Sequence, residues 1–118
     1  MRSKYFCTNS VAVLLATCVV AGGFVSAARA DDAKATYDKT CATCHGPGGK
    51  GDGAVGKMLK PPPKEFAAAL AGAADADIAK VIKEGGKAVG KSASMPAYGS
   101  KLNDEQIKGL VQYIKGLK

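Results

Sequence analysis

The sequence contains no tryptophan and a single histidine, His45, and this shortage limits how it can bind a metal. Two histidines of one chain cannot ligate the same iron here. A structural zinc site takes about four ligands, mostly Cys and His, and we expect two of the four cysteines to be removed with an N-terminal leader. Zinc is therefore disfavoured, and a metal site must combine His45 with ligands of another kind.

The leader comprises residues 1–30, which have the features of a cleaved secretory signal peptide. Arg2 and Lys4 give a positively charged start, an apolar run follows, and residues 28–30 read Ala-Arg-Ala, a small-x-small cleavage site. Cleavage at this site leaves residues 31–118 as the single mature domain. The chain is thus expected to be exported.

Removing the leader changes the charge and the cysteine count. The loss of three basic residues lowers the formal net charge from +7 to +4, and the loss of Cys7 and Cys18 leaves two cysteines. We expect no disulfide and no membrane span in the mature chain. One alternative is that the uncharged stretch 11–28 remains as an uncleaved membrane anchor. Another is a lipoprotein cleavage box, which residues 15–18 faintly resemble.

No segment of the mature chain has the alternating pattern of a strand, so we predict an all-α fold. Helices are predicted at 33–44 and at 65–71. Residues 75–77 are predicted to cap a further helix, which carries Ile78, Val81 and Ile82 as its apolar stripe and stops at residues 85–86. The C-terminal helix is the clearest, because Asn103 and Gln106 can form a capping box before an apolar stripe. That stripe comprises Ile107, Leu110, Val111, Ile114 and Leu117.

Two segments cannot be helical. Residues 46–56 contain six glycines and must form a loop, where glycine lets the backbone approach a bound group closely. Residues 61–63 are three prolines, expected to form a rigid wall beside a bound group or else a spacer. Residues 85–92 match the phosphate-loop pattern, but no strand precedes them and Pro96 follows too soon for the required helix. We therefore expect no nucleotide or nucleic-acid partner.

The most specific motif is Cys41-Ala42-Thr43-Cys44-His45, the Cys-x-x-Cys-His pattern of c-type haem attachment. In such a site both thiols form thioethers with the porphyrin and the imidazole ligates iron. On a helix, positions i and i+4 share a face with i+3 beside them, so all three side chains can reach one flat ring. A redox Cys-x-x-Cys would need a βαβ pattern, and a disulfide across so short a loop would add little stability. We predict one covalently bound haem c, with iron, held by Cys41, Cys44 and His45.

The sixth iron ligand must come from a residue other than histidine. A thioether is a soft ligand suited to haem iron, and the mature chain has two methionines, Met58 and Met95. Met95 lies fifty residues past His45 in an irregular segment stiffened by Pro96, so a loop can carry it to the far haem face. Met58 is interpreted as a core or haem-face side chain. We predict Met95 as the ligand, with Met58, a lysine or water as the alternatives.

With these motifs the mature chain, residues 31–118, resembles a class I cytochrome c with a single haem. Residues 41–45 match the haem motif, residues 95–98 (Met-Pro-Ala-Tyr) are similar to the distal Met-Pro segment, and residues 110–114 resemble the C-terminal helix. The resemblance implies short helices wrapped around the haem. It further implies that the first and last helices cross nearly at right angles, with Ala33 and Tyr37 meeting Leu110 and Tyr113.

The resemblance implies a periplasmic electron carrier that shuttles single electrons through a His/Met-ligated haem and is not an enzyme. Redox partner proteins with acidic docking surfaces are expected, because lysines could ring an exposed haem edge. The alternative function is a haem enzyme or gas sensor with a labile sixth ligand. In the family a Gly-Pro carbonyl often accepts a hydrogen bond from the axial histidine, and Gly53-Ala54 stands in its place here.

Overall fold

The structure of the protein is a computed structural model that describes residues 25–117. Within this range every regular element is helical and none is a strand, which confirms the predicted all-α fold. In chain order the elements are α1 (Val25–Thr40), α2 (Ala42–His45), η1 (Gly56–Met58), α3 (Phe66–Ala69), α4 (Asp75–Glu84), η2 (Lys87–Val89) and α5 (Asp104–Gly116), where η marks a 3-10 helix. Residues 1–24, and with them most of the predicted signal peptide, lie outside the described residues.

Helix α1 differs from the predicted helix 33–44 at both ends. It begins at Val25, runs through the predicted cleavage site and ends at Thr40, and α2 follows as a separate turn. The early start reflects an alanine-rich stretch with high helix propensity, which the interpretation as a cleavage site left out. Cleavage after Ala30 stays a prediction. Within the described part of the chain, none of the helices is both long and apolar enough to span a membrane.

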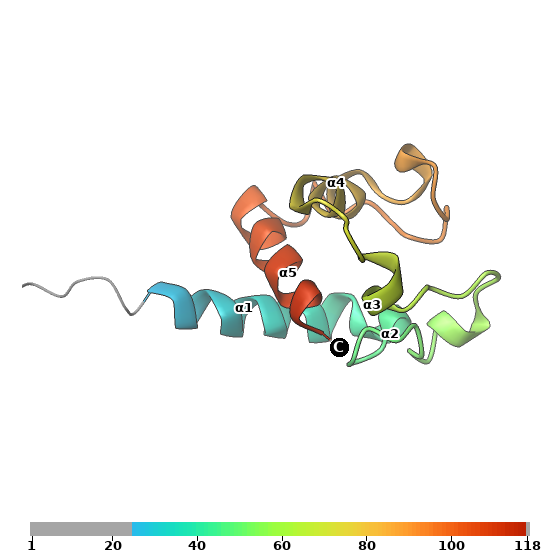
Figure 1. The fold of residues 1–118 in the computed structure, drawn as a ribbon, viewed down its shortest axis with the longest axis horizontal. Coiled ribbons are helices and arrows are strands. Elements are labelled where there is room, and N and C mark those ends of the chain that lie inside the picture. The colour runs from blue at the N-terminus through green and yellow to red at the C-terminus, as the bar shows by residue number, and fades with distance from the viewer. Residues whose placement is uncertain (1–24, 118) are drawn as a thin grey trace, which may run out of the picture.

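The core forms where α5 lies across α1, as Figure 1 shows. Tyr37 of α1 is fully buried, and its ring centroid lies 5.2 Å from that of Tyr113 on α5. The helices approach closely because small residues face each other: a Cβ placed on Gly109 would lie 3.5 Å from the Cβ of Ala33. The expected contact of Tyr37 with Tyr113 is thus confirmed, and Ala33 meets Gly109.

Helix α5 has the predicted local structure. The Asn103 side chain accepts a hydrogen bond from the Gln106 backbone N–H (2.8 Å), and the Gln106 side chain accepts one from the Asn103 N–H (3.0 Å), so the capping box is confirmed. The predicted stripe faces the core, and the exposed fractions of Ile107, Leu110, Val111 and Ile114 are 6% or less.

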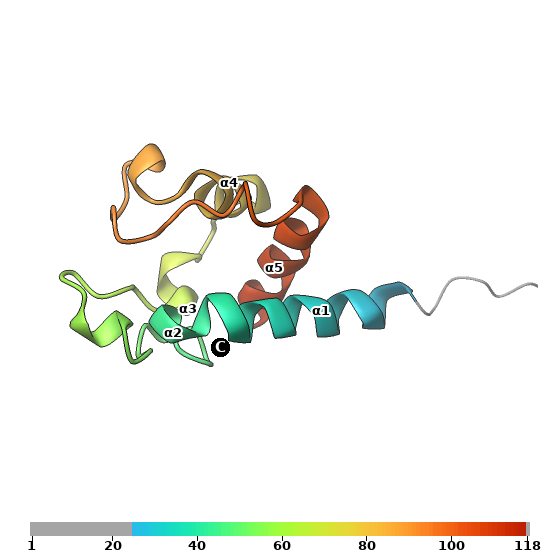
Figure 2. The ribbon, with the colours of Figure 1, turned by 180° about the vertical axis from the view of Figure 1, so that it is seen from behind.

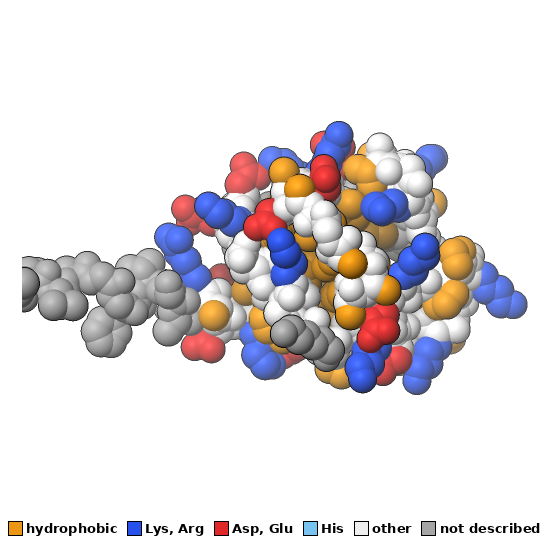
Figure 3. All heavy atoms as spheres, viewed as in Figure 1, with side chains coloured by type: hydrophobic (Ala, Val, Ile, Leu, Met, Phe, Trp, Pro, Cys, Tyr) orange, Lys and Arg blue, Asp and Glu red, His pale blue; other side chains and the backbone are white. Residues whose placement is uncertain are grey.

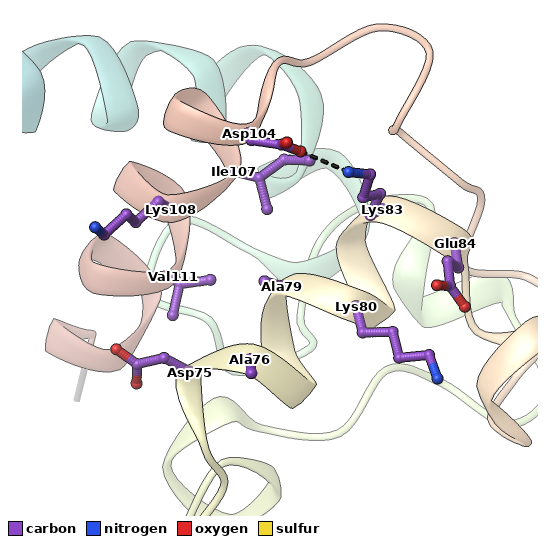
Figure 4. A pocket seen from close by; sticks show the side chains of 10 residues that line it. All are labelled: Asp75, Ala76, Ala79, Lys80, Lys83, Glu84, Asp104, Ile107, Lys108 and Val111. Atoms are coloured by element: carbon purple, nitrogen blue, oxygen red, sulfur yellow. Dashed lines mark hydrogen bonds and ion pairs between the residues drawn. The ribbon is translucent and has the colours of Figure 1, made fainter.

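Helix α4 packs on α5 through apolar side chains bordered by ion pairs. Figure 4 shows Ile107 and Val111 on the side of α5 that faces α4, beside an ion pair of 2.6 Å between Lys83 and Asp104. Asp75 does not cap α4 as predicted, since the N-cap is Ala74 and no side chain caps it. The Asp75 carboxylate instead accepts hydrogen bonds from Gln112 (2.6 Å) and Lys115 of α5. These contacts hold the pKa of Asp75 below its ordinary value.

The glycine-rich loop folds beneath α2 with almost no space between the two backbones. The Val55 N–H donates to the Thr43 carbonyl (3.0 Å), and the Gly51 N–H donates to that of His45 (2.8 Å). A Cβ on Gly53 would lie 2.3 Å from the Thr43 oxygen, and one on Gly56 would lie 2.0 Å from the Cys44 oxygen. These glycines therefore let the loop support the Cys-x-x-Cys-His turn from behind.

Replacing Gly53 by alanine should destabilise the holoprotein, because the new methyl group has to displace a backbone carbonyl of α2. Overpacking of this kind costs about 1–3 kcal/mol, measurable as the free energy of unfolding in urea. The matched control is Gly116→Ala, since a Cβ at Gly116 meets nothing within 4 Å, and alanine is the better helix former by up to ~1 kcal/mol. Equal effects of the two substitutions would contradict this reading of the loop.

Candidate haem site

The residues of the Cys-x-x-Cys-His motif form a single helical turn. The backbone N–H groups of Cys44 and His45 both donate to the Cys41 carbonyl, at 3.1 and 2.9 Å. The three side chains are half-buried, and the two cysteines are not joined by a disulfide. Because the turn is short and closed by these bonds, it directs both thiols and the imidazole to one cleft.

This cleft has a volume of about 1010 Å³ and is lined by residues of all five α-helices, of η2 and of the loops between them. All four predicted site residues line it, namely Cys41, Cys44, His45 and Met95. Its walls are mainly apolar and include Pro61, Pro62, Pro63, Phe66, Ile78, Ile82, Leu110 and Ile114. The volume is just above the usual range for ligand pockets, about 300–1,000 Å³. The three prolines form the predicted wall.

The two methionines occupy different environments. Met95 is half-buried and lines the cleft, whereas the side chain of Met58 is 72% exposed and is not part of the lining. The interpretation of Met58 as a core or haem-face residue is therefore wrong. Its neighbour Leu59 lines the cleft instead, because η1 ends at Met58 and the chain becomes extended at Leu59.

The loop that carries Met95 is bonded to the end of α4. The Gly86 N–H donates to the Met95 carbonyl (2.9 Å), and the Tyr98 N–H donates to that of Ile82 (2.9 Å). Figures 1 and 2 show the chain leaving α4 through η2 and returning toward α5. Gly86 sits so close to this returning chain that a Cβ would lie 2.1 Å from the Ser92 oxygen. Gly86, which lies within the segment that matches the phosphate-loop pattern, thus lets the chain that carries Met95 pack against the end of α4.

His45 has the chemical state that a metal ligand needs. Burial lowers the pKa of its imidazole, which favours the neutral ring, and only a neutral imidazole has a lone pair for a metal. Its Nδ1 is buried and has no hydrogen-bond partner among the described residues. Residues 53–54 stand where the family has the carbonyl that accepts from the axial histidine. The Gly53 carbonyl accepts its hydrogen bond from the Lys57 N–H (3.0 Å).

The Cys41 thiol is unsuited to redox chemistry, and the surroundings of the motif do not fit a zinc site. Burial, and secondly the neighbouring Cys44, raises the pKa of Cys41 to about 11, whereas thiol–disulfide enzymes lower the pKa of their attacking cysteine. The described residues also contain no group of three Cys, His, Asp or Glu side chains that could hold a metal ion. The neutral imidazole, the two thiols and the large apolar cleft fit a covalently attached haem.

The fold and this cleft define a c-type cytochrome domain of the small, single-haem kind. Comparison with known proteins gives the same class: residues 28–114 match the family described as cytochrome c oxidase, cbb3-type, subunit III. The chain belongs to this family. The domains of this family carry covalently attached haem c with iron.

Two similar proteins are each described as a cbb3-type cytochrome c oxidase subunit CcoP. The one from Azospirillum brasilense is 36% identical over 91 residues, which cover 77% of this chain and 29% of that protein. The one from Azospirillum sp. (strain B510) is 32% identical over 97 residues, covering 81% of this chain and 31% of that protein. The chain thus spans less than a third of the length of these relatives.

Phe66 is a residue of the site that sequence reasoning missed. Its ring stacks on the His45 imidazole, with ring centroids 4.7 Å apart and an angle of 25° between the planes. Nothing in the local pattern of the short helix α3 indicates this contact. One signal was available, because Phe66 is the single phenylalanine of residues 31–118.

The Tyr37 hydroxyl is hydrogen-bonded to the turn that follows the motif, and a substitution can measure what this bond contributes to stability. The buried O–H donates to the Gly46 carbonyl (2.6 Å). Tyr37→Phe should cost about 1–3 kcal/mol of unfolding free energy, because it leaves that carbonyl without its buried donor. Urea unfolding of the holoprotein measures this loss. Tyr113→Phe is the control, since Tyr113 is only half-buried, and an equal loss there would show that the Tyr37 bond is not special.

Proposed function

We propose that the protein is a periplasmic electron carrier with one haem c, attached through Cys41 and Cys44 and with its iron ligated by His45 and Met95. The observation that supports this most is that one apolar cleft collects all four side chains, from the turn at residues 41–45 and from the loop after η2. When bound, the haem supplies reversible one-electron exchange at its iron. The thioether of Met95 favours ferrous iron, and burial in the cleft adds to that preference.

The chain's own residues limit what else the site can do. Apolar side chains dominate the walls of the cleft, which disfavours water. If His45 and Met95 both ligate the iron, they would leave no free position for a substrate. In addition, His45 is the only histidine of the chain, so no second imidazole can assist in cleaving a peroxide. These features favour electron transfer over a haem enzyme or gas sensor.

The likeness to oxidase subunits suggests a partner, and the surface suggests how it docks. Val55 and Met58 are 37% and 72% exposed. They directly precede Leu59 and the three prolines, which line the cleft. Lys57, Lys60 and Lys64 are exposed in the same stretch, with no acidic residue between 53 and 64. Figure 3 shows hydrophobic atoms among basic side chains at the end of the molecule away from the grey residues. We propose that this surface meets an acidic patch on a cbb3-type oxidase.

The test is to purify the exported protein and record its mass, its visible spectra and a redox titration. A mass increment of one haem, a low-spin spectrum in both redox states and a one-electron titration curve are expected. A high-spin oxidised spectrum, with binding of CO or NO to the untreated protein, would favour the enzyme or sensor. A mass without the increment would overturn the proposal itself.

A further inference from the structure

The acidic and basic side chains that line the haem cleft all come from residues 64–91, and most of them are basic. They are Lys64, Asp77, Lys80 and Lys91. Three lysines and one aspartate give this lining a formal net charge of +2. Residues 37–45, which supply both thiols and the imidazole, contribute no acidic residue and no lysine to the lining. The positive charge of the cleft is therefore separated along the chain from the haem attachment motif.

The three lysines of the lining, called the rim lysines below, are exposed and lie on three different segments. Lys64 precedes α3, Lys80 is on α4, and Lys91 is in the loop after η2. None of them takes part in the ion pairs that the described residues form. Figure 4 shows the Lys80 side chain extending from α4 away from α5. Within the described part of the chain, the three ammonium groups are thus available to a bound anion.

Haem itself supplies the anions that such a rim would bind. Its two propionates lie on the edge of the ring opposite the two vinyl groups. Thioethers to Cys41 and Cys44 would hold the vinyl edge at the motif, so the carboxylates would point away from it. An apolar wall disfavours a carboxylate that has no partner, whereas an ammonium group beside it stabilises its ionised form. The charge of +2 on the lining balances the two propionates.

We propose that Lys64, Lys80 and Lys91 bind the two haem propionates and so fix the carboxylate edge of the haem in the cleft. This rests on the proposed function, because it requires attachment through the Cys-x-x-Cys-His motif. The rim lysines then offset the negative charge of the propionates beside the iron, which favours the ferrous state. Lys64 accordingly differs from Lys57 and Lys60 of the docking surface, which do not line the cleft.

The test is a redox titration of the holoprotein with all three rim lysines replaced by glutamine. The charge-matched control is a second triple variant, Lys39→Gln, Lys57→Gln and Lys87→Gln. These control lysines are exposed, do not line the cleft and form none of the ion pairs among the described residues. Loss of the rim should raise the ratio of ferric to ferrous protein at a fixed potential about tenfold, which lowers the reduction potential by ~59 mV. The control should shift it much less.

The pH dependence of the reduction potential gives a second measurement. Ferric haem favours ionised propionates, so the potential falls as the pH rises through their pKa values. Without the rim lysines these pKa values should rise, and the fall should move to higher pH. The titratable groups of the lining outside the motif and the rim are Tyr37, Asp77 and Tyr98. Burial raises the pKa of both tyrosines, which moves their titration to more alkaline pH, and Asp77→Asn measures any part that the aspartate plays.

Replacing the rim lysines by arginine keeps their charge and should leave both measurements near the wild-type values. If the wild-type protein carries no haem, the proposed function has failed before the rim is tested. If it carries haem and the two glutamine triples give equal shifts, the rim lysines are ordinary surface charges, and only the present proposal is wrong. Should the rim triple yield no holoprotein, its three single variants decide. Each is expected to lower the potential more than Lys57→Gln does, and equal shifts would overturn the proposal.

Discussion

Replacing both Cys41 and Cys44 by serine is expected to abolish haem attachment and, with it, cooperative folding of the domain. The buried hydrophobic core is small and consists of Ala33, Tyr37, Ile78, Ile82, Ile107, Leu110, Val111 and Ile114. Beside it lies a cleft of about 1010 Å³. A dry cavity costs about 24 cal/mol per Å³, so a quarter of this volume left empty would cost about 6 kcal/mol. That is comparable to the whole stability of a small domain, about 5–15 kcal/mol.

The measurement is thermal unfolding of the double variant, followed by circular dichroism beside the holoprotein. We expect a broad, weakly cooperative change in place of a sharp transition, because helices α4 and α5 lose the apolar body against which Ile82 and Ile114 pack. The same wild-type chain produced without haem attachment is the matched control and should behave like the variant. A sharp transition within a few degrees of the holoprotein would show that the polypeptide folds without the haem.

The sequence was a good guide wherever a short stretch of chain decides the structure. The capping box at Asn103 and the apolar stripe of α5 depend on residues three and four apart, so their pattern is visible without knowledge of the fold. The Cys-x-x-Cys-His motif is equally local, and its residues do line one cleft. Met95 follows from exclusion rather than from a pattern, since few residue types suit haem iron, and its role as the sixth ligand stays a prediction.

The features that sequence reasoning missed depend on contacts between distant residues. Asp75 looked like a helix cap, but its carboxylate binds Gln112 and Lys115, which are 37 and 40 residues away. Met58 and Leu59 are adjacent and both apolar, and only the turn of η1 decides which of them faces the cleft. The break at the end of α1 coincides with the packing of the glycine-rich loop beneath α2, so the position of the break cannot be inferred from helix propensity alone.

Met95→Ala should give the largest change in redox properties that a single substitution outside the haem motif can produce. Removing the thioether opens the sixth position to water or to a lysine, and Lys91 also lines the cleft. Oxygen and nitrogen ligands favour ferric iron more than a thioether does. The reduction potential should therefore fall by on the order of 0.1 V or more, within the ~0.8 V that axial ligands span. The methionine-to-iron charge-transfer band at the red end of the oxidised spectrum should vanish.

Met58→Ala is the matched control, because it deletes the same side chain from a position that is 72% exposed. Its reduction potential and its spectrum should equal those of the wild-type protein within error. The opposite result, in which Met58→Ala loses the band and Met95→Ala keeps it, would move the ligand to η1. That outcome would require η1 to leave its place beneath α2, where the Lys57 N–H is bonded to the Gly53 carbonyl. The pair of variants thus tests the ligand and the fold of the glycine-rich loop together.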